Sequence, residues 1–274
     1  MRPEFQEGAL PPPPPGCRHL NLVSRCVVGD DTILDNIRHS ITLGLPEFGA
    51  SLVRNNGDFI ICGSGPSIEG EIESLRQWKK DRATICSLND AHDWLVDHGI
   101  IPDLHLMLDP TKQMAERVKK PQHGVVYLIA SQCHSEVFER LSGYGLVIWH
   151  ALALLGEEEI LGNRMRIGGG VTVGLRALNF GYMLGFHKFH LYGYDSCLSG
   201  DRLRVTGEGV KNGNVMEVIC GGRKFYANPA MAGQANDVSQ AIDCFNGNIR
   251  VKAYGDGLLQ HVLNERTRLG HSDW

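Results

Sequence analysis

The 274-residue sequence lacks features that would assign it at once to several familiar classes of protein. Its eight cysteines form no Cys-x-x-Cys pair, and Cys62 and Cys86 lie in apolar runs, where a free cysteine packs as a small hydrophobic residue. No apolar run approaches the length that spans a bilayer, and no charged N-terminal segment precedes an apolar stretch as in a signal peptide. We therefore expect a soluble protein in a reducing compartment, the cytoplasm.

An excess of positive charge is also missing. The chain has 27 lysines and arginines against 31 aspartates and glutamates, a formal net charge of −4. This balance gives no electrostatic reason to expect a nucleic-acid groove or an anionic membrane surface as a partner, although a local basic patch is compatible with it. Hydrophobic residues make up 42% of the chain, which is enough to bury a sizeable core.

Residues 58–67 (DFIICGSGPS) contain the most informative pattern. The apolar run at 59–61 is typical of a buried strand, and Gly63 and Gly65 allow a sharp turn and a close approach of the backbone to a ligand. Pro66 is tolerated in the first turn of a helix, where its missing N–H costs nothing. Apolar residues then recur with helical spacing at Ile68, Ile72 and Leu75.

A strand, a tight loop and a helix in this order indicate an anion site, because the start of a helix offers free N–H groups and the positive end of its dipole. We interpret the loop as a nucleotide-phosphate site; the alternative is a tight turn that binds nothing. The third glycine of the dinucleotide fingerprint is missing and no Gly-Lys-Ser/Thr occurs, so neither that fold nor a P-loop is supported. The predicted nucleotide-binding residues of the loop are Gly63, Ser64, Gly65, Pro66 and Ser67.

The chain divides into three predicted parts. Residues 1–20, with five consecutive prolines at 11–15, form a disordered proline-rich tail, either a linker or a polyproline ligand. Residues 21–55 form an N-terminal helical extension, because Ile33, Ile37 and Ile41 predict an amphipathic helix that ends near Gly44. Residues 56–274 form the main domain, and no internal repeat divides it.

The main domain is predicted to be an α/β fold: a Rossmann-like, mostly parallel sheet with flanking helices and a C-terminal hairpin and helical extension. The predicted strands are residues 59–61, 83–88, 104–108, 125–130, 146–149 and 188–192, with helices at 91–98 and 171–184. Residues 215–219 and 224–226 bracket a Gly-Gly turn as in a hairpin. Helices at 232–245 and 257–266 and a strand at 248–253 follow. Residues 199–222, with the hairpin, are either a lid or substrate-facing insertion or simply a surface hairpin.

Polar residues that follow the strands are the candidates for chemistry, since ligands of open α/β sheets bind beyond the carboxyl ends of the strands. Asn89 and Asp90 stand where a polar side chain commonly meets a ribose; the alternative is a helix N-cap. Asp109 and Asp195 end strands and are the predicted catalytic residues, as Mg²⁺ ligands or as a general base. The alternative for both is turn chemistry.

A second glycine-rich helix entry lies at residues 168–172. Gly169, Gly170 and Thr172 form a second possible anion site, where Thr172 supplies a hydroxyl; the alternative is close packing of the helix on the sheet. His92, His134 and His150, near strand ends or helix starts, are less favoured acid/base candidates.

Five motifs follow one another along the chain: GSGPS at 63–67, NDA at 89–91, GIIPD at 99–103 leading to LDP at 108–110, GGGVT at 168–172 and, after LG at 184–185, YGYD at 192–195. As an ordered set they resemble the 6-hydroxymethylpterin diphosphokinase MptE-like family, which includes flagellin-modifying motility accessory factors and is similar in fold to a bacterial sialyltransferase family. The resemblance covers about residues 58–197. It leaves out the tail, the first helix and the region after residue 199.

The resemblance implies a nucleotide-binding transferase with a small-molecule nucleotide and an acceptor as its partners. It also implies that residues 169–172 would close on the other side of the nucleotide. Its diphosphokinase members imply Mg²⁺-dependent transfer of diphosphate from ATP to a hydroxymethyl group, and its sialyltransferase-like relatives imply sugar transfer from a nucleotide sugar. The latter use a histidine after the last core strand, but only His261 and His271 follow Asp195 here, far along the chain. Diphosphate transfer is therefore the leading hypothesis. A glycosyltransferase, in which residues 199–231 would shape the acceptor site, and a non-catalytic nucleotide-binding accessory protein are the alternatives, and a homo-oligomer is compatible with the sequence.

Overall fold

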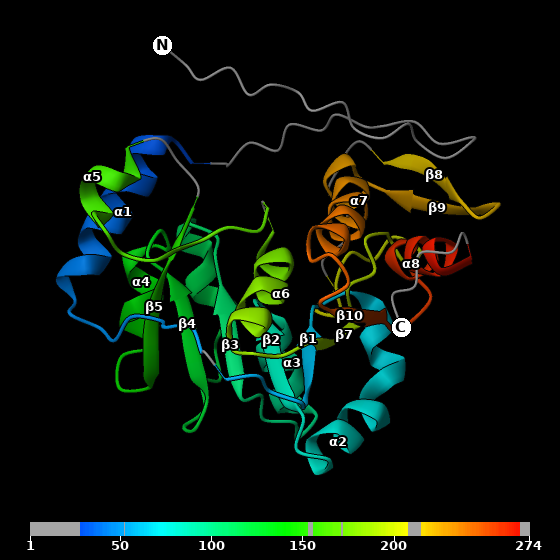
Figure 1. Ribbon diagram of the computed structural model, residues 1–274, viewed down its shortest axis with the longest axis horizontal. Helices are drawn as coiled ribbons and strands as arrows, with labels where there is room; N and C mark the ends of the chain where they lie inside the picture. The colour runs from blue at the N-terminus through cyan, green and yellow to red at the C-terminus, as the bar shows by residue number, and fades with distance from the viewer. Residues whose placement is uncertain (1–27, 52, 153–155, 171, 208–214, 269–274) are drawn as a thin grey trace.

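The computed structural model describes residues 28–51, 53–152, 156–170, 172–207 and 215–268 (Figure 1). The predicted proline-rich tail, residues 1–20, lies outside the described residues, as does part of the predicted lid segment. None of the described helices combines the length and the apolar character needed to cross a bilayer.

Within the described residues, eight parallel strands form one sheet in the order β10-β7-β1-β2-β3-β4-β5-β6 (Figure 1). The predicted Rossmann-like fold is confirmed, and every predicted strand of the sheet is present. The strands are β1 (Asp58–Cys62), β2 (Thr84–Leu88), β3 (Leu104–Met107), β4 (Val126–Ala130), β5 (Gly145–Ala151), β6 (Arg166–Ile167), β7 (Lys188–Tyr192) and β10 (Arg250–Ala253).

The order of the strands reverses beside β1. From β1 to β6 each new strand adds on the same side, whereas β7 returns to the other side of β1 and β10 follows beyond it. The register pairs Cys62 at the end of β1 with Ser87 of β2 and with Tyr192 of β7. The residues that follow these three strands are therefore brought to one place, and such a reversal is where open α/β sheets bind their ligands.

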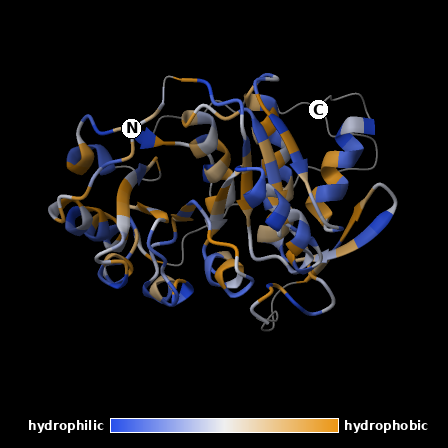
Figure 2. Ribbon diagram, turned by 90° about the horizontal axis from the view of Figure 1, so that it is seen from below, coloured by the Kyte–Doolittle hydropathy of each residue, from blue (hydrophilic) through white to orange (hydrophobic). Residues whose placement is uncertain are grey.

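Alternate residues of β1 enter the two hydrophobic layers on opposite faces of the sheet. Phe59 and Ile61 belong to the large cluster that contains Phe180 of α6 (Val173–Met183). Ile60 and Cys62 belong to the second cluster, which three helices cover. These are η1 (Pro66–Glu71), α2 (Ile72–Lys80) and α3 (Ala91–Asp97). In Figure 2, orange hydrophobic stretches run along the strands of the sheet.

The remaining elements lie at the two ends of the sheet (Figure 1). At one end the predicted first helix, α1, packs on two short helices; at the other end the predicted hairpin and last two helices are present, with α8 against β10. Their bounds are α1 (Asp30–Thr42), α4 (Ser135–Arg140), α5 (Glu157–Leu161), β8 (Met216–Cys220), β9 (Arg223–Ala227), α7 (Pro229–Cys244) and α8 (Leu258–Arg268), with η2 (Lys112–Arg117) after β3.

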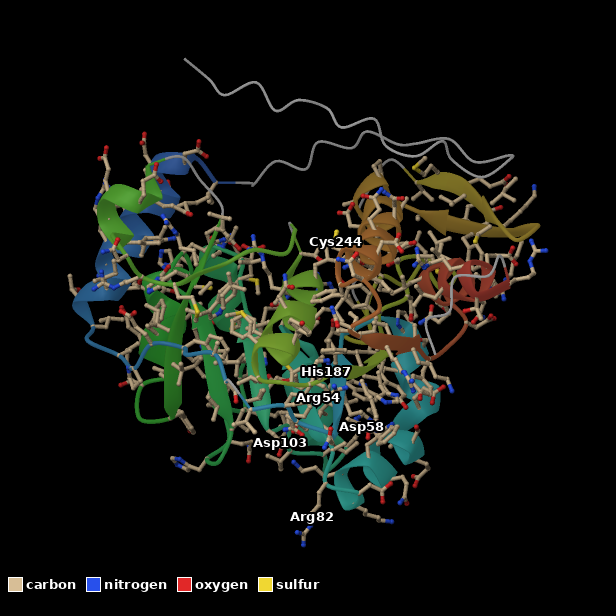
Figure 3. All side chains as sticks on the ribbon, in the orientation of Figure 1. Arg54, Asp58, Arg82, Asp103, His187 and Cys244 are labelled. Carbon is tan, nitrogen blue, oxygen red and sulfur yellow. The ribbon has the colours of Figure 1, made fainter. Side chains whose placement is uncertain are left out.

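The amino edge of the sheet carries ionisable residues that begin or precede strands. Asp58 begins β1, Asp103 precedes β3 and His187 precedes β7, and Figure 3 shows their side chains on the lower side of the molecule. The carboxyl ends of the parallel strands, and with them the candidate chemistry, lie at the opposite edge.

Candidate functional site

A cleft opens at the carboxyl ends of β1, β2 and β7. Its volume, counted with the solvent in its open mouth, is about 660 Å³. Polar and glycine residues that follow the three strands line it, together with side chains from 203–204 and from α7. They include residues 63–65, Asn89, residues 193–197, Arg204 and Gln234.

The glycine loop after β1 lies against the loop after β7, and the two backbones are in direct contact. Gly63 N donates a hydrogen bond to Tyr192 O and Gly65 N donates one to Gly193 O, both with a length of 2.8 Å. A Cβ on Gly63 would lie 2.5 Å from Gly193 O, so no larger residue fits there without movement of the backbone. The predicted tight turn is present, but the N–H groups of Gly63 and Gly65 already donate within the protein.

Asp195 occupies the start of η1, where the sequence predicts a ligand anion. Its carboxylate accepts hydrogen bonds from Ser67 N, at 2.9 Å, and from Ser67 Oγ. Asp195 is 6% exposed; burial raises the pKa of its carboxyl, and the hydrogen bonds from Ser67 oppose that shift. A Cβ on Gly65 would lie 2.8 Å from this carboxyl group, which explains the second glycine of the loop.

Asn89 and Asp90 follow β2 but occupy different positions. Asn89, with φ at +45°, lines the cleft, and its Oδ1 is buried without a hydrogen-bond partner among the described residues. Asp90 stands before α3, yet its side chain makes no capping hydrogen bond. Its buried carboxylate instead accepts from Arg204 Nη1 at 2.6 Å, Thr206 Oγ1 at 3.2 Å and Arg117 Nη1 at 3.4 Å.

Arg204 is the charged residue among the cleft residues that the sequence did not predict; others are Met231 and Gln234. Its guanidinium lies between Asp90 and Ser64 Oγ, which is 3.5 Å from Nη1. The adjacent Val205 N donates to Ser64 O at 2.8 Å, so this part of the chain is fixed across the glycine loop. The predicted substrate-facing segment 199–231 contains Arg204, but no spacing or motif singles out this arginine from its neighbours.

The second glycine-rich entry positions α6. Thr172 Oγ1 accepts from Leu175 N at 3.4 Å as the N-cap and is 3.0 Å from Tyr194 Oη. Burial raises the pKa of Tyr194 to about 12. Gly169 and Gly170 have φ of +120° and +75°, which favours glycine, but neither they nor Thr172 are among the residues that line the cleft. Their predicted contact with a nucleotide stays a prediction.

Asp109 and Asp195 do not lie together in the cleft. Asp109 follows β3, its Oδ1 accepts from Thr111 N at 2.8 Å as in an Asx turn, and it is not among the lining residues. Among the described residues, no group of three or more His, Cys, Asp or Glu side chains is arranged to hold a metal ion. The shared magnesium site predicted for the two aspartates therefore has no geometric support here, and Mg²⁺ binding stays a prediction.

The candidate histidines lie outside the residues that line the cleft. His92 is buried between Tyr127 Oη and Asp93, His134 caps α4 by accepting from Glu136 N, and His150 is buried at the end of β5. His261 of α8 contacts Arg223. Of the two histidines that follow Asp195, His271 lies outside the described residues.

Comparison with known proteins bears on the identity of the fold. The model of a family described as 6-hydroxymethylpterin diphosphokinase MptE-like matches residues 31–201, so the match includes α1, which sequence reasoning leaves outside. A solved structure of a MAf glycosyltransferase from Magnetospirillum magneticum AMB-1 superposes with a TM-score of 0.67 at 17% identity. The aligned region covers 83% of this chain and 36% of that one. No curated protein sequence matches this chain.

Proposed function

This chain belongs to the 6-hydroxymethylpterin diphosphokinase MptE-like family, and on that premise we propose that it is a transferase whose nucleotide donor binds in the cleft. The family and the structural neighbour both point to a transferase. The position of the cleft supports nucleotide binding, because it lies where the strand order reverses.

Of the transfer reactions open to such a protein, transfer of a sugar from a nucleotide sugar fits the cleft best. The observation that carries this choice is Arg204, a cation on the cleft wall that a buried carboxylate fixes in place. As the bond between sugar and phosphate breaks, negative charge develops on the nucleotide phosphate. A fixed guanidinium stabilises that charge, so the reaction needs neither a metal ion nor a second carboxylate to hold one.

Asp195 is the proposed general base. The acceptor hydroxyl oxygen attacks the anomeric carbon, its proton passes to the Asp195 carboxylate, and the bonding electron pair leaves with the nucleotide phosphate. An ionised carboxylate has about four lone-pair sites, so the two hydrogen bonds from Ser67 leave capacity for this proton. Asn89 Oδ1 is the proposed acceptor for a ribose hydroxyl.

Diphosphate transfer from ATP to a hydroxymethyl group is the second candidate, and the description of the matching family favours it. It requires Mg²⁺, which binds one or two carboxylates together with phosphate oxygens and water. In the cleft Asp195 would hold the ion, which would neutralise phosphate charge. A non-catalytic accessory protein remains the third alternative, to be recognised by binding without product.

The test is a thermal-shift panel of ATP, GTP, CTP, UTP and CMP- and UDP-sugars, each with and without Mg²⁺. A ligand at a hundred times its dissociation constant stabilises by about 2.7 kcal/mol, a rise of roughly 5–11 °C in Tm for a protein of this size. We expect a nucleotide sugar to raise the Tm by the same amount with and without Mg²⁺. This rise should be lost in Arg204→Gln but kept in the matched control Arg202→Gln, since Arg202 pairs with Glu69 outside the cleft.

Turnover separates the candidates once a donor is known. Release of nucleotide from a CMP- or UDP-sugar, slow without acceptor, supports glycosyl transfer. A shift with ATP that requires Mg²⁺, with diphosphate transfer to a hydroxymethyl compound, contradicts it in favour of the second candidate. Absence of a shift with every nucleotide refutes the proposal of a nucleotide donor.

A further inference from the structure

We propose that Asp90 is a positioning residue, which fixes Arg204 so that its guanidinium contacts the phosphate of the bound nucleotide. This inference rests on the proposed function and deepens it. It replaces the sequence-based expectation that Asp90 itself contacts the nucleotide.

The burial of Asp90 is the first argument. The residue is 4% exposed, and a carboxylate in that position is costly unless it is paired and hydrogen-bonded. Both of its oxygens have partners: Oδ1 accepts from Arg204, and Oδ2 accepts from Thr206 and Arg117. Asp90 is not among the residues that line the cleft, so it acts on a ligand through a neighbour.

The position of Arg204 is the second argument. Its side chain is 29% exposed against 6% for Asp90, and it lines the cleft while Asp90 lies behind it. The same Nη1 is 2.6 Å from Asp90 Oδ1 and 3.5 Å from Ser64 Oγ, so the guanidinium joins the loops after β1 and β2. An arginine held at its tip loses little further freedom when a phosphate binds, which makes the contact stronger than that of a mobile side chain.

A purely structural role is the competing explanation, because Asp90 also anchors Thr206 and so helps to hold residues 202–206. The chain offers a matched control for this. Glu69 anchors the same segment by accepting two hydrogen bonds from Arg202, at 2.6 and 3.2 Å, but neither residue lines the cleft. Loss of Glu69 removes an anchor without touching Arg204.

The experiment measures dissociation constants by calorimetry for AMP, CMP and UMP and for the matching nucleosides. The proteins are wild type, Asp90→Asn, Glu69→Gln, Arg204→Gln and the double variant Asp90→Asn with Arg204→Gln. We expect Asp90→Asn to weaken nucleotide binding about tenfold while nucleoside binding is unchanged. Glu69→Gln should match wild type, and the double variant should bind no more weakly than Arg204→Gln, because Asp90 acts through Arg204.

Three results overturn the inference: nucleotide affinity of Asp90→Asn equal to wild type, equal losses for nucleotide and nucleoside, or additive losses in the double variant. If Asp90→Asn does not fold, Asp90→Glu takes its place, since it keeps the charge but moves the carboxylate; unchanged nucleotide affinity then refutes the inference. Failure of wild type to bind any nucleotide is a different outcome, which refutes the proposed function and this inference with it.

Discussion

Gly63 shows how a single residue determines the shape of the cleft. A Cβ there would press on the carbonyl oxygen of Gly193, whereas Gly70, three residues after Ser67, has nothing within 4 Å of the same position. We expect Gly63→Ala to lower the free energy of unfolding by about 1–3 kcal/mol, because the two loops must move apart. Gly70→Ala should leave it unchanged or slightly raised. Urea unfolding of both variants provides the measurement.

Asp195 should give the protein a particular dependence of stability on pH. Burial raises the pKa of its carboxyl above the ordinary value of 3.8, so the unfolded chain loses this proton at a lower pH than the folded one. Asp195 therefore lowers the stability of the native state as the pH rises from about 3.8 through its folded pKa, and has no further effect above it. Relative to Asp195→Asn, wild type should lose stability across this window in urea unfolding measured from pH 3.5 to 7.

The contrasting residue is Asp256, where the Arg223 guanidinium lowers the pKa of the carboxyl. Asp256→Asn should therefore remove stability that is present at neutral pH and is lost as the pH falls below 3.8. The effect should be small, because the Asp256 side chain is 70% exposed and solvent screens the pair. If Asp195→Asn followed the same trend as Asp256→Asn, the burial of Asp195 would not control its protonation.

Individual residues of the cleft differ in how far the sequence predicts them. Asn89 comes directly after β2 and Asp195 three residues after the end of β7, and the apolar runs reveal both strands, so the place of these residues at the carboxyl edge follows from the pattern. Arg204 follows no strand, and its role depends on Asp90, more than a hundred residues earlier in the chain. No local pattern records such a pairing, and for the same reason the contact between Ser67 and Asp195 is absent from the prediction.

At the scale of elements, α7 brings Met231 and Gln234 to the cleft, and Asn228 starts this helix by accepting from Met231 N at 2.9 Å. Asn228→Ala should cost about 1 kcal/mol of stability, because one N–H at the start of the helix loses its acceptor. The control is Asn264→Ala, an exposed site inside α8, where alanine is neutral or favourable. Thermal unfolding of the two variants would contradict this role of Asn228 if their Tm values agreed.

Most elements were predictable, but three short helices and the shortest strand were not. Strands β1 to β5 and β7 stand out as apolar runs, and α6 and α7 are long enough to show their period. In contrast, η2, α4 and α5 have six residues or fewer, so their apolar positions recur too seldom to reveal a helix, and β6 has only two residues. The helical segment that begins at Pro66 is a 3-10 helix as far as Glu71, and the expected α-helix begins only at Ile72.

At the scale of the whole molecule, the described C-terminal elements complete the main core. Val238 and Ile242 of α7 and Leu263 of α8 belong to the same hydrophobic cluster as Phe59 and Ile61 of β1. A chain that ends at residue 201, where the family match ends, should therefore lose cooperative unfolding, because it leaves this surface exposed. Urea unfolding followed by circular dichroism tests this. A sharp transition in the shortened chain would instead indicate that residues 56–274 comprise two independent units.

The reversal of strand order beside β1 also has a consequence for biosynthesis. β1 is made early, yet its neighbour β7 lies about 130 residues later, and Arg204, Met231 and Gln234 follow later still. A nascent chain on the ribosome can form β1 to β6 in succession, while one edge of β1 remains unpaired until β7 has been synthesised. Such distant pairing slows folding and leaves an unpaired strand open to wrong contacts. The cleft is thus acquired only when most of the chain has been synthesised.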